Sequence, residues 1–348
     1  MSRLESHFGT RIPWSSDRSK PVPHHFGDPT AESRALLTDV ALVDFSHHET
    51  VAISGENVND FLGGLITNQV KKVTPQKSVY SAHLTPQGRF LWDFTLLRDA
   101  DRLLLITEPG SATPLAQRLS PFILRAKIRI EVESTLAMLG IAGPESSQVL
   151  QGIFPEFPIL DAPLGETLSP ESGIRLWRDP RHAGFGWRLL VPASAVSAWW
   201  ERLVKRIPPA GFAAWEEYRI RLALPRGGNE FIPEVSLPLE SGLLEMNGVD
   251  FAKGCYVGQE TTARTHHRGT LKKRVYSLML SAGEIVTPGT PILLPSGKET
   301  GVLTSVTPGT GERIGLGILH PSDVEQDRAF TIGPLQVTAQ KPDWATWA

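Results

Sequence analysis

Two short apolar runs joined by a four-residue turn set the strongest limit on the fold of this chain. Residues 78–84 read SVYSAHL and residues 89–97 read RFLWDFTLL, with TPQG between them and proline at the second position of the turn. A second turn, RDAD, leads into a third run, RLLLIT. Strands joined by such short connections pair antiparallel. The sequence therefore predicts an α+β fold with mainly antiparallel sheets and argues against a doubly wound fold.

The length of 348 residues exceeds what one hydrophobic core usually serves and predicts two or three domains. Helix and strand patterns predict a first α+β domain, whose helix–strand–strand–helix–strand order resembles a split βαβ unit, and then a second. Short strands separated by Gly, Pro and Ser turns predict a small C-terminal β-barrel. We expect an arm at 1–29, α+β domains at 30–135 and 136–209, a bridging segment at 210–270 and the barrel at 271–341.

Composition argues against several classes of protein. The formal net charge is -2, which is unsuited to a protein that coats nucleic acid by bulk attraction. No apolar run approaches the ~20 residues of a membrane span, and the first 29 residues lack the apolar core of a secretory signal. A single cysteine excludes an intramolecular disulfide and suits a reducing compartment. We therefore expect a cytoplasmic protein that binds neither membrane nor nucleic acid directly.

The single cysteine, Cys255, lies in the stretch KGCYVGQE, which is followed by TARTHHRG. A thiol reacts as its thiolate, which neighbouring cations favour, and flanking glycines allow a tight backbone and the close approach of a ligand. The alternative is a buried and unreactive cysteine, which is common for a lone cysteine. The local residues leave both interpretations open. The motif residues are Lys253, Gly254, Cys255, Tyr256, Gly258, Gln259, Glu260 and Arg264.

Basic residues continue beyond the cysteine, from Arg264 to Arg274. One interpretation is a solvated strand face, and the other is an anion site for a polycarboxylate tail or an RNA phosphate. Three pairs of adjacent histidines suggest metal binding. However, neighbours on a strand point to opposite faces, so one pair rarely gives two ligands to one ion. We therefore predict no metal site.

Three further polar residues are of interest, and the residues alone make only Asp93 a candidate for facing a ligand. Asp93 lies among apolar residues in RFLWDFTLL, where a buried acid needs a partner. It is either a carboxylate that faces a ligand or the outward member of an alternating strand. Asn68 closes an expected helix and is alternatively a helix cap. Glu240 lies in the irregular stretch PLESG and is alternatively a solvated loop carboxylate.

The stretch KGCYVGQE followed by TARTHHRG resembles the signature of the YgfZ family. These are folate-binding proteins related to the glycine-cleavage T-protein and involved in iron–sulfur cluster biogenesis. LVDFSHHETVAISGENVNDFLGGLITNQV resembles the first domain of the family, and LTPQGRFLWDFTLLR resembles its central hairpin. WEEYRIRLALPRGG resembles its bridging helix and PLESGLLEMNGVDF the lead-in to the signature. The resemblance covers residues 25–340.

The resemblance implies a three-domain, ring-like fold of the T-protein type, in which part of residues 210–265 packs back onto the first domain. It also implies a tetrahydrofolate pocket at the centre, with the signature cysteine near it. Cys255 and Asp93 are then the candidate catalytic residues. The candidate folate-binding residues are Asn68, Asp93, Arg219 and Glu240.

Some positions depart from the T-protein pattern. WDF holds one acid where the T-protein usually shows two, and HAGFGWRLL lacks the glutamate of its GYTGE-like stretch. Arg221 stands at the next acidic position of the bridging helix. These departures, with a cysteine signature that the T-protein lacks, favour the branch that serves cluster biogenesis.

The resemblance therefore favours a cytoplasmic tetrahydrofolate-binding accessory protein. It would help to assemble or repair iron–sulfur clusters, with assembly proteins or client enzymes as partners, including radical enzymes that modify tRNA. Since a cluster usually needs about four protein ligands, Cys255 would supply one in a transient complex, bridge to a cluster of the partner or protect a redox intermediate. The alternatives are a folate-dependent aminomethyl- or methyltransferase, with Asp93 as the acid–base group, and a non-catalytic folate-binding scaffold.

Overall fold

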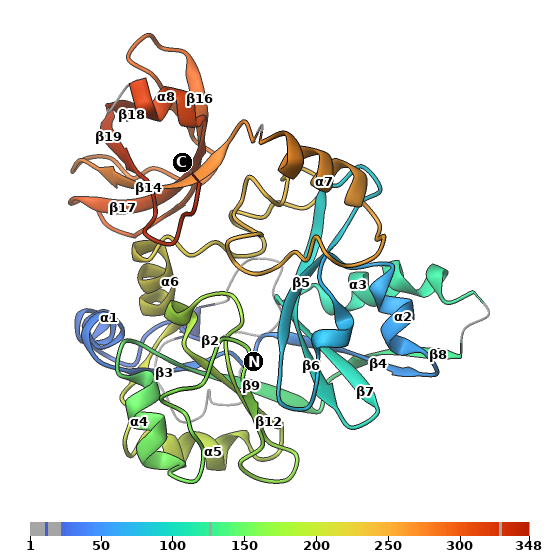
Figure 1. Cartoon of the computed structure of the whole chain (residues 1–348). Coiled ribbons are helices and arrows are strands. Elements are labelled where there is room, and N and C mark those ends of the chain that lie inside the picture. Colours follow the sequence, from blue (N-terminus) through green and yellow to red (C-terminus); the bar gives the residue numbers. More distant parts are fainter. Residues whose placement is uncertain (1–10, 13–21, 125–126, 270, 327–328, 348) are drawn as a thin grey trace. The chain divides into compact units, whose positions relative to one another are not determined.

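The computed structural model describes residues 11–12, 22–124, 127–269, 271–326 and 329–347 (Figure 1). Its chain divides into two compact units, each assembled from separate stretches of sequence. The first unit takes the described parts of 1–82, 92–215 and 247–256, and the second takes those of 83–91, 216–246 and 257–348. None of the described helices is long and apolar enough to cross a membrane.

Most of the predicted arm at 1–29 lies outside the described residues. Within the described part, strand β1 (Arg11–Ile12) pairs antiparallel with β2 (Val22–Pro23), and helix α1 (Pro29–Thr38) follows. Asp28 caps α1, because its side chain accepts a hydrogen bond from the Ala31 N–H at 3.0 Å.

One sheet has five strands in the order β5-β6-β7-β4-β8. Its strands are β4 (Glu49–Gly55), β5 (Val79–Leu84), β6 (Phe90–Asp99), β7 (Arg102–Thr107) and β8 (Ile128–Glu133). Its helices are α2 (Val58–Gly63), η1 (Val70–Lys72), α3 (Ala112–Leu119) and η2 (Ser120–Phe122). The pairs β4–β7, β4–β8 and β6–β7 are antiparallel, and β6–β7 is the pair that the short RDAD turn predicts.

A second sheet has six strands in the order β10-β11-β12-β9-β3-β13. Its strands are β3 (Ala41–Asp44), β9 (Leu136–Ala142), β10 (Thr167–Leu168), β11 (Arg175–Arg178), β12 (Trp187–Pro192) and β13 (Pro209–Ala210). Its helices are α4 (Ser146–Ile153), η3 (Ala183–Phe185) and α5 (Val196–Leu203). Only the short β13 pairs parallel, with β3.

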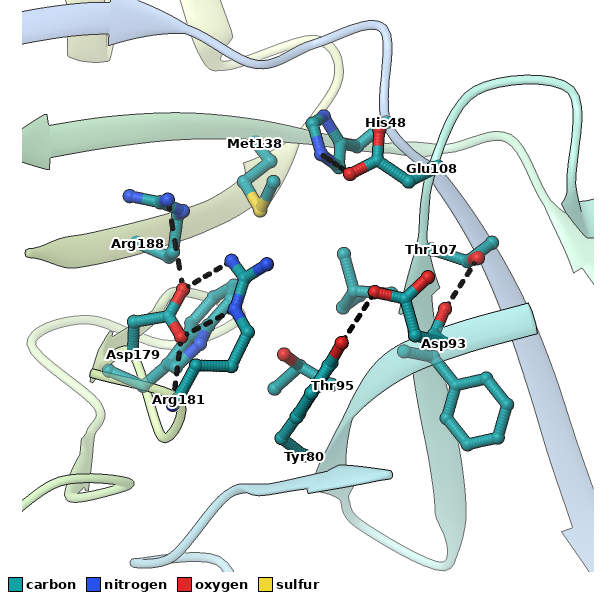
Figure 2. Close-up of a pocket in the computed structure, with 13 residues that line it drawn as sticks. His48, Tyr80, Asp93, Thr95, Thr107, Glu108, Met138, Asp179, Arg181 and Arg188 are labelled. Carbon is teal, nitrogen blue, oxygen red and sulfur yellow. Dashed lines mark hydrogen bonds and ion pairs between the residues drawn. The ribbon is translucent and has the colours of Figure 1, made fainter. Parts of the chain in front are cut away.

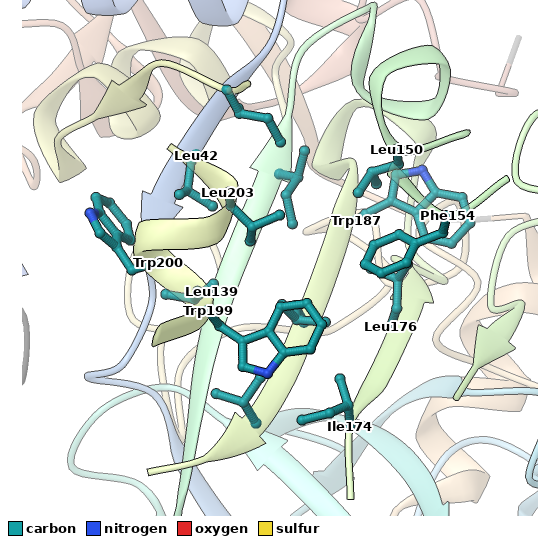
Figure 3. Packing of buried hydrophobic residues seen from close by; sticks show 14 of the residues in the cluster. Leu42, Leu139, Leu150, Phe154, Ile174, Leu176, Trp187, Trp199, Trp200 and Leu203 are labelled. Atoms are coloured by element: carbon teal, nitrogen blue, oxygen red, sulfur yellow. The ribbon is translucent and has the colours of Figure 1, made fainter. Parts of the chain in front are cut away.

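The core of the second sheet is aromatic and aliphatic (Figure 3). Trp187 from β12 and Trp200 from α5 are fully buried, and Leu139 and Leu176 lie on neighbouring strands of the same cluster. Burial of such side chains contributes about 1.5–3 kcal/mol each relative to exposure. This core therefore holds α4 and α5 against the sheet.

The second unit contains most of helix α6 (Phe212–Arg221), helix α7 (Gln259–Arg268) and a closed six-stranded barrel in the order β14-β17-β16-β15-β18-β19. The barrel strands are β14 (Arg274–Leu280), β15 (Pro291–Leu293), β16 (Glu299–Val306), β17 (Arg313–Leu319), β18 (Phe330–Ile332) and β19 (Leu335–Gln340), with helix α8 (Pro321–Gln326) between β17 and β18. Antiparallel pairing of β14 with β19 closes it. The predicted α+β class and the C-terminal barrel are confirmed.

The basic run after the cysteine does not form one strand face, so that interpretation is wrong. Arg264 lies on α7, where it pairs with Glu260 one turn earlier, and the strand β14 begins only at Arg274. The helix begins and ends at glycines in the left-handed conformation, Gly258 at φ 84° and Gly269 at φ 60°. A left-handed glycine is a common helix stop, so Gly269 accounts for the end of α7.

The two motif glycines differ in what the structure requires of them. A Cβ on Gly258 would meet the Thr85 carbonyl oxygen at 2.5 Å, because the turn between β5 and β6 packs directly on the start of α7. A Cβ on Gly254 would meet nothing within 4 Å. The expected close backbone packing therefore applies to Gly258 and not to Gly254.

We expect Gly258→Ala to lower the free energy of unfolding by about 1–3 kcal/mol, because it combines a strained backbone with a clash against another backbone. Gly254→Ala is the matched control in the same motif, and it should change stability by less than about 0.5 kcal/mol. Thermal unfolding followed by circular dichroism measures both. Equal midpoints for the two variants would contradict the packing of this turn on α7.

Candidate functional site

A small cavity in the first unit gathers many of the buried polar side chains (Figure 2). Its volume of about 30 Å³ holds one or two water molecules and is smaller than a pteridine ring system. Strands of both sheets supply its walls. The lining residues are His48, Tyr80, Asp93, Phe94, Thr95, Ile106, Thr107, Glu108, Met138, Trp177, Asp179, Arg181 and Arg188.

Asp93 is the carboxyl group at the centre of this arrangement. Its Oδ2 accepts a hydrogen bond from the Tyr80 hydroxyl at 2.7 Å, and its own carbonyl accepts one from Thr107 Oγ1 at 2.9 Å. Burial and the nearby Glu108 carboxylate raise the pKa of Asp93 to about 6, although Tyr80 and Arg181 oppose the change. Asp93 therefore faces the cavity as an acid that exchanges its proton near neutral pH.

Two arginines and one aspartate form a buried charged cluster across the cavity from Asp93 (Figure 2). Arg181 binds Asp179 through Nε at 2.9 Å and Nη2 at 2.7 Å, and its guanidinium lies 3.7 Å from the Phe185 ring centroid. Arg188 approaches the same carboxylate at 3.7 Å. Burial works against ionisation, yet the two arginines hold the pKa of Asp179 below its usual value. The cluster therefore presents fixed positive charge to the cavity.

Asn68 links this hairpin to a distant part of the chain. Its Nδ2 donates to the Tyr80 carbonyl at 2.8 Å and to the Asn247 carbonyl at 2.7 Å, while its Oδ1 accepts from the Gln69 N–H at 2.8 Å. Both amide hydrogens are therefore used within the protein. Asn68 positions Tyr80, whose hydroxyl in turn holds Asp93.

The side chain of Cys255 is exposed, so the alternative of a buried cysteine is wrong. The chain that leads to it is held on the first unit by three contacts. Thr67 Oγ1 donates to the Gly248 carbonyl at 2.6 Å, the Asp250 N–H donates to the Thr67 carbonyl at 3.0 Å, and Lys72 pairs with the Asp250 carboxylate at 2.9 Å. The exposed thiol thus follows a tethered segment.

Lys253 adds the strongest tether. Its Nζ donates to the carbonyls of Gly63, at 2.7 Å, and Ile66, which lie at the end of α2, where carbonyls lack helical partners. The ammonium also lies 4.7 Å from the Tyr256 ring centroid. Burial lowers the pKa of Lys253 to about 8. Its charge is committed to these carbonyls, whereas the sequence predicts a cation acting on the Cys255 sulfur.

Arg219 lies in the second unit and is fully buried. Its five N–H groups all have acceptors: two on Glu216, one on Glu230, the Leu224 carbonyl and the Ser305 hydroxyl. Glu230 Oε1 accepts in turn from Ser305 at 2.6 Å. Arg219 therefore ties the end of α6 to the barrel.

Glu240 and Arg264 also belong to the second unit. Glu240 is half-buried, and its Oε1 accepts the Lys273 N–H at 3.3 Å. Arg264 is exposed on α7 and pairs with Glu260. The structure thus connects Asn68 and Asp93 with the chain leading to Cys255 inside one unit, and it assigns Arg219, Glu240 and Arg264 to the other.

Sequence reasoning missed most partners of Asp93. Tyr80 could have been predicted as a neighbour of Asp93 from the hairpin alone. The Thr85 N–H donates to the Arg89 carbonyl across the TPQG turn, and counting residues back along both strands from this pair puts Tyr80 nearly opposite Asp93. The sequence around Arg181 and Asp179 gives only a weak indication of a site, because it shows no more than two charged residues on either side of a proline after a strand. Their position depends on how the second sheet packs, which no local pattern indicates.

Comparison with known proteins gives two family matches and several relatives. The GCVT N-terminal domain matches residues 8–250, and the CAF17 C-terminal beta-barrel domain matches residues 272–347. The mitochondrial iron–sulfur cluster assembly factor IBA57 of Mus musculus is 31% identical over 84% of this chain and 82% of its own length. The tRNA-modifying protein YgfZ of Escherichia coli is 24% identical over 87% of this chain and 91% of its own.

A crystal structure of the glycine cleavage system aminomethyltransferase T from Bartonella henselae has the same fold. The TM-score is 0.78 at 16% identity, and the match covers 98% of this chain and 96% of the other. The human IBA57 is 29% identical over 91% of this chain and 87% of its own length. The predicted family is confirmed: this chain belongs to the GCVT N-terminal domain family, in the branch with a CAF17-type barrel that contains IBA57 and YgfZ.

Proposed function

We propose that this chain is a tetrahydrofolate-binding accessory factor that helps to assemble or repair iron–sulfur clusters. The observation that carries the proposal is the exposed thiol of Cys255 at the end of a segment tethered to α2 and to the Asp93 network. The relatives named as iron–sulfur cluster assembly factors support it. We place the protein in the cytoplasm, because its one cysteine suits a reducing compartment.

Cys255 would bind the cluster as cargo, together with a partner. No group of three or more His, Cys, Asp or Glu side chains in the described part of the chain can hold a metal ion. Since a cluster usually needs about four protein ligands, the other ligands must come from an assembly protein or a client enzyme. The relative named as a tRNA-modifying protein supports clients that modify tRNA.

The side chains around the Asp93 cavity fit a reduced pterin in chemical type. A pterin carries amino and amide N–H groups that need carboxylate acceptors, and Asp93, held by the Tyr80 hydroxyl, supplies one beside the guanidinium of Arg181. The space of about 30 Å³ does not admit the ring system, so binding requires the cavity to widen. Asn68 and Arg219, whose N–H groups are used within the protein, serve as positioning residues in this proposal, and Glu240 remains a proposed folate contact.

A folate-dependent aminomethyl- or methyltransferase is the second candidate, and a non-catalytic folate-binding scaffold is the third. The pKa of about 6 favours the enzyme, because burial and Glu108 poise Asp93 to move a proton at neutral pH. Turnover of a methylamine donor that is lost in Asp93→Asn would establish the enzyme. The scaffold would be established if the wild type showed no turnover and the Cys255→Ser variant still rescued the strain that lacks the gene.

We expect Cys255→Ala and Cys255→Ser to abolish rescue of a strain that lacks the gene, because neither side chain can ligate iron as a thiolate. The measurement is the activity of cluster-dependent enzymes in the rescued cells, with protein levels checked by immunoblot. Gly254→Ala, next to the cysteine and sterically tolerated, is the matched control. Rescue by Cys255→Ser at the wild-type level would contradict the proposal that the Cys255 sulfur binds the cluster.

We expect Asp93→Ala to weaken tetrahydrofolate binding by about 10- to 100-fold, since a hydrogen bond to a charged group is worth about 1.5–3 kcal/mol. Isothermal titration calorimetry under anaerobic conditions measures the dissociation constant. Asp101→Asn, an exposed acid in the turn after β6, is the control that should bind as the wild type does. The folate proposal fails if wild type shows no binding heat.

The raised pKa of Asp93 also predicts a change of stability with pH. The folded state holds this proton more tightly than the unfolded state, so the proton's contribution to stability is complete below the ordinary pKa of 3.8 and is lost as pH rises to about 6. Above that pH the buried charge costs up to about 3 kcal/mol. Asp93→Asn removes this cost, so the variant should gain stability relative to wild type between pH 4 and pH 7. Urea unfolding at both pH values tests this, and an unchanged difference between the proteins would contradict the assigned pKa.

A further inference from the structure

The second unit contains a groove whose lining residues, apart from the proposed folate contact Glu240, have none of the roles above. Its volume of about 640 Å³ lies within the range of ligand-binding sites. It is lined by the turn between β5 and β6, the irregular chain before the cysteine motif, the second half of α7, the residues just before β14 and one face of the barrel. The lining residues are Arg89, Ile232, Val235, Ser236, Leu237, Glu240, Ser241, Arg264, Thr265, Lys272, Lys273, Val302, Ile318 and His320.

The groove carries an excess of positive charge. Lys272 and Lys273 have no carboxylate within ion-pair distance among the described residues, and Arg89 donates to a backbone carbonyl rather than to an acid. Glu240 is the single acid in the lining, and it accepts a backbone N–H from Lys273. Cations gathered around a concave surface with one acid among them favour an anionic ligand.

Apolar side chains lie among these charges. Val235 is 61% exposed and Ile232 is 37% exposed, whereas Ile318 and Val302 extend the apolar wall on the barrel side. An inorganic anion gains nothing from such a wall. A ligand that carries both carboxylates and aliphatic side chains would use the whole groove.

The chain that bears the exposed aliphatic residues is held in place before any ligand arrives. The Glu234 N–H donates to the Phe90 carbonyl at 2.7 Å, and the Phe90 N–H donates to the Ser236 carbonyl at 3.0 Å. Arg89 Nη1 donates to the Val235 carbonyl at 2.6 Å. Phe90 also stacks on Phe231, with ring centroids 5.3 Å apart. A wall fixed in this way loses little entropy on binding.

We propose that this groove binds an acidic segment of a partner polypeptide, with aliphatic side chains interspersed among its carboxylates. Single-stranded RNA fits less well, because the described lining contains no Phe, Tyr or Trp on which bases could stack, and the net charge of the chain is -2. The proposal requires neither a cluster on Cys255 nor a folate beside Asp93, so it stands or fails apart from them.

The test is binding of a short fluorescent peptide of glutamate and leucine to the full chain, measured by fluorescence anisotropy. We expect the double variant Lys272→Glu with Lys273→Glu to weaken binding by about tenfold, since it replaces two attractive surface charges with two repulsive ones. Lys298→Glu makes the same kind of change at an exposed barrel position outside the groove and should change affinity by less than about twofold. Val235→Asp tests the apolar wall separately and should also weaken binding.

Three results would overturn the proposal. The first is no binding to wild type at low salt, or equal affinity of wild type and the double variant. The second is equal weakening by Lys298→Glu, which would mean unspecific attraction. The third is tighter binding of a single-stranded RNA oligonucleotide or of polyglutamyl tetrahydrofolate than of the peptide, with the same variants affected. Thermal unfolding confirms that every variant is folded.

Discussion

The attachment of residues 247–256 to the loop after α2 is the interaction on which the position of Cys255 depends. The Lys253 ammonium is removed from water, which lowers its pKa, and it is retained because backbone carbonyls at the end of α2 accept its hydrogen bonds. Asn68 joins the same segment to the strand that carries Tyr80. The thiol and the buried acid are therefore positioned by one connected set of hydrogen bonds, although neither contacts the other directly.

The ionisation of the two buried aspartates in the first unit is set by their neighbours. Asp179 keeps its charge because Arg181 and Arg188 surround it, whereas Asp93 has a phenol and a second carboxylate nearby and so retains a proton more easily. Two aspartates on opposite sides of one cavity thus differ in ionisation. Environments that push the pKa values of paired acids apart are typical of sites that handle protons.

Features set by local chemistry were predictable from the sequence, and features set by packing were not. The TPQG turn predicts the β5–β6 hairpin, and regular Gly and Pro turns predict the barrel. A strand face was one of two interpretations of the basic run that begins at Arg264, and it is wrong because Arg264 pairs with Glu260 on a helix that the sequence analysis did not predict. Asp93 was identified as a buried acid that needs a partner, yet Arg181 reaches the cavity from a sheet far along the chain, and no periodicity reports such a contact. Arg219 was correctly located on its helix, where Glu216 lies one turn earlier, whereas its ion pair with Glu230 depends on the tertiary structure.

The chain passes between the two compact units several times, which has a consequence for its biosynthesis. The first unit needs residues 247–256 to complete its contacts, and the second needs residues 83–91 from the middle of an early hairpin. During translation α2 lacks the Lys253 ammonium until the cysteine segment has left the ribosome, so we expect folding of the first unit to be completed late.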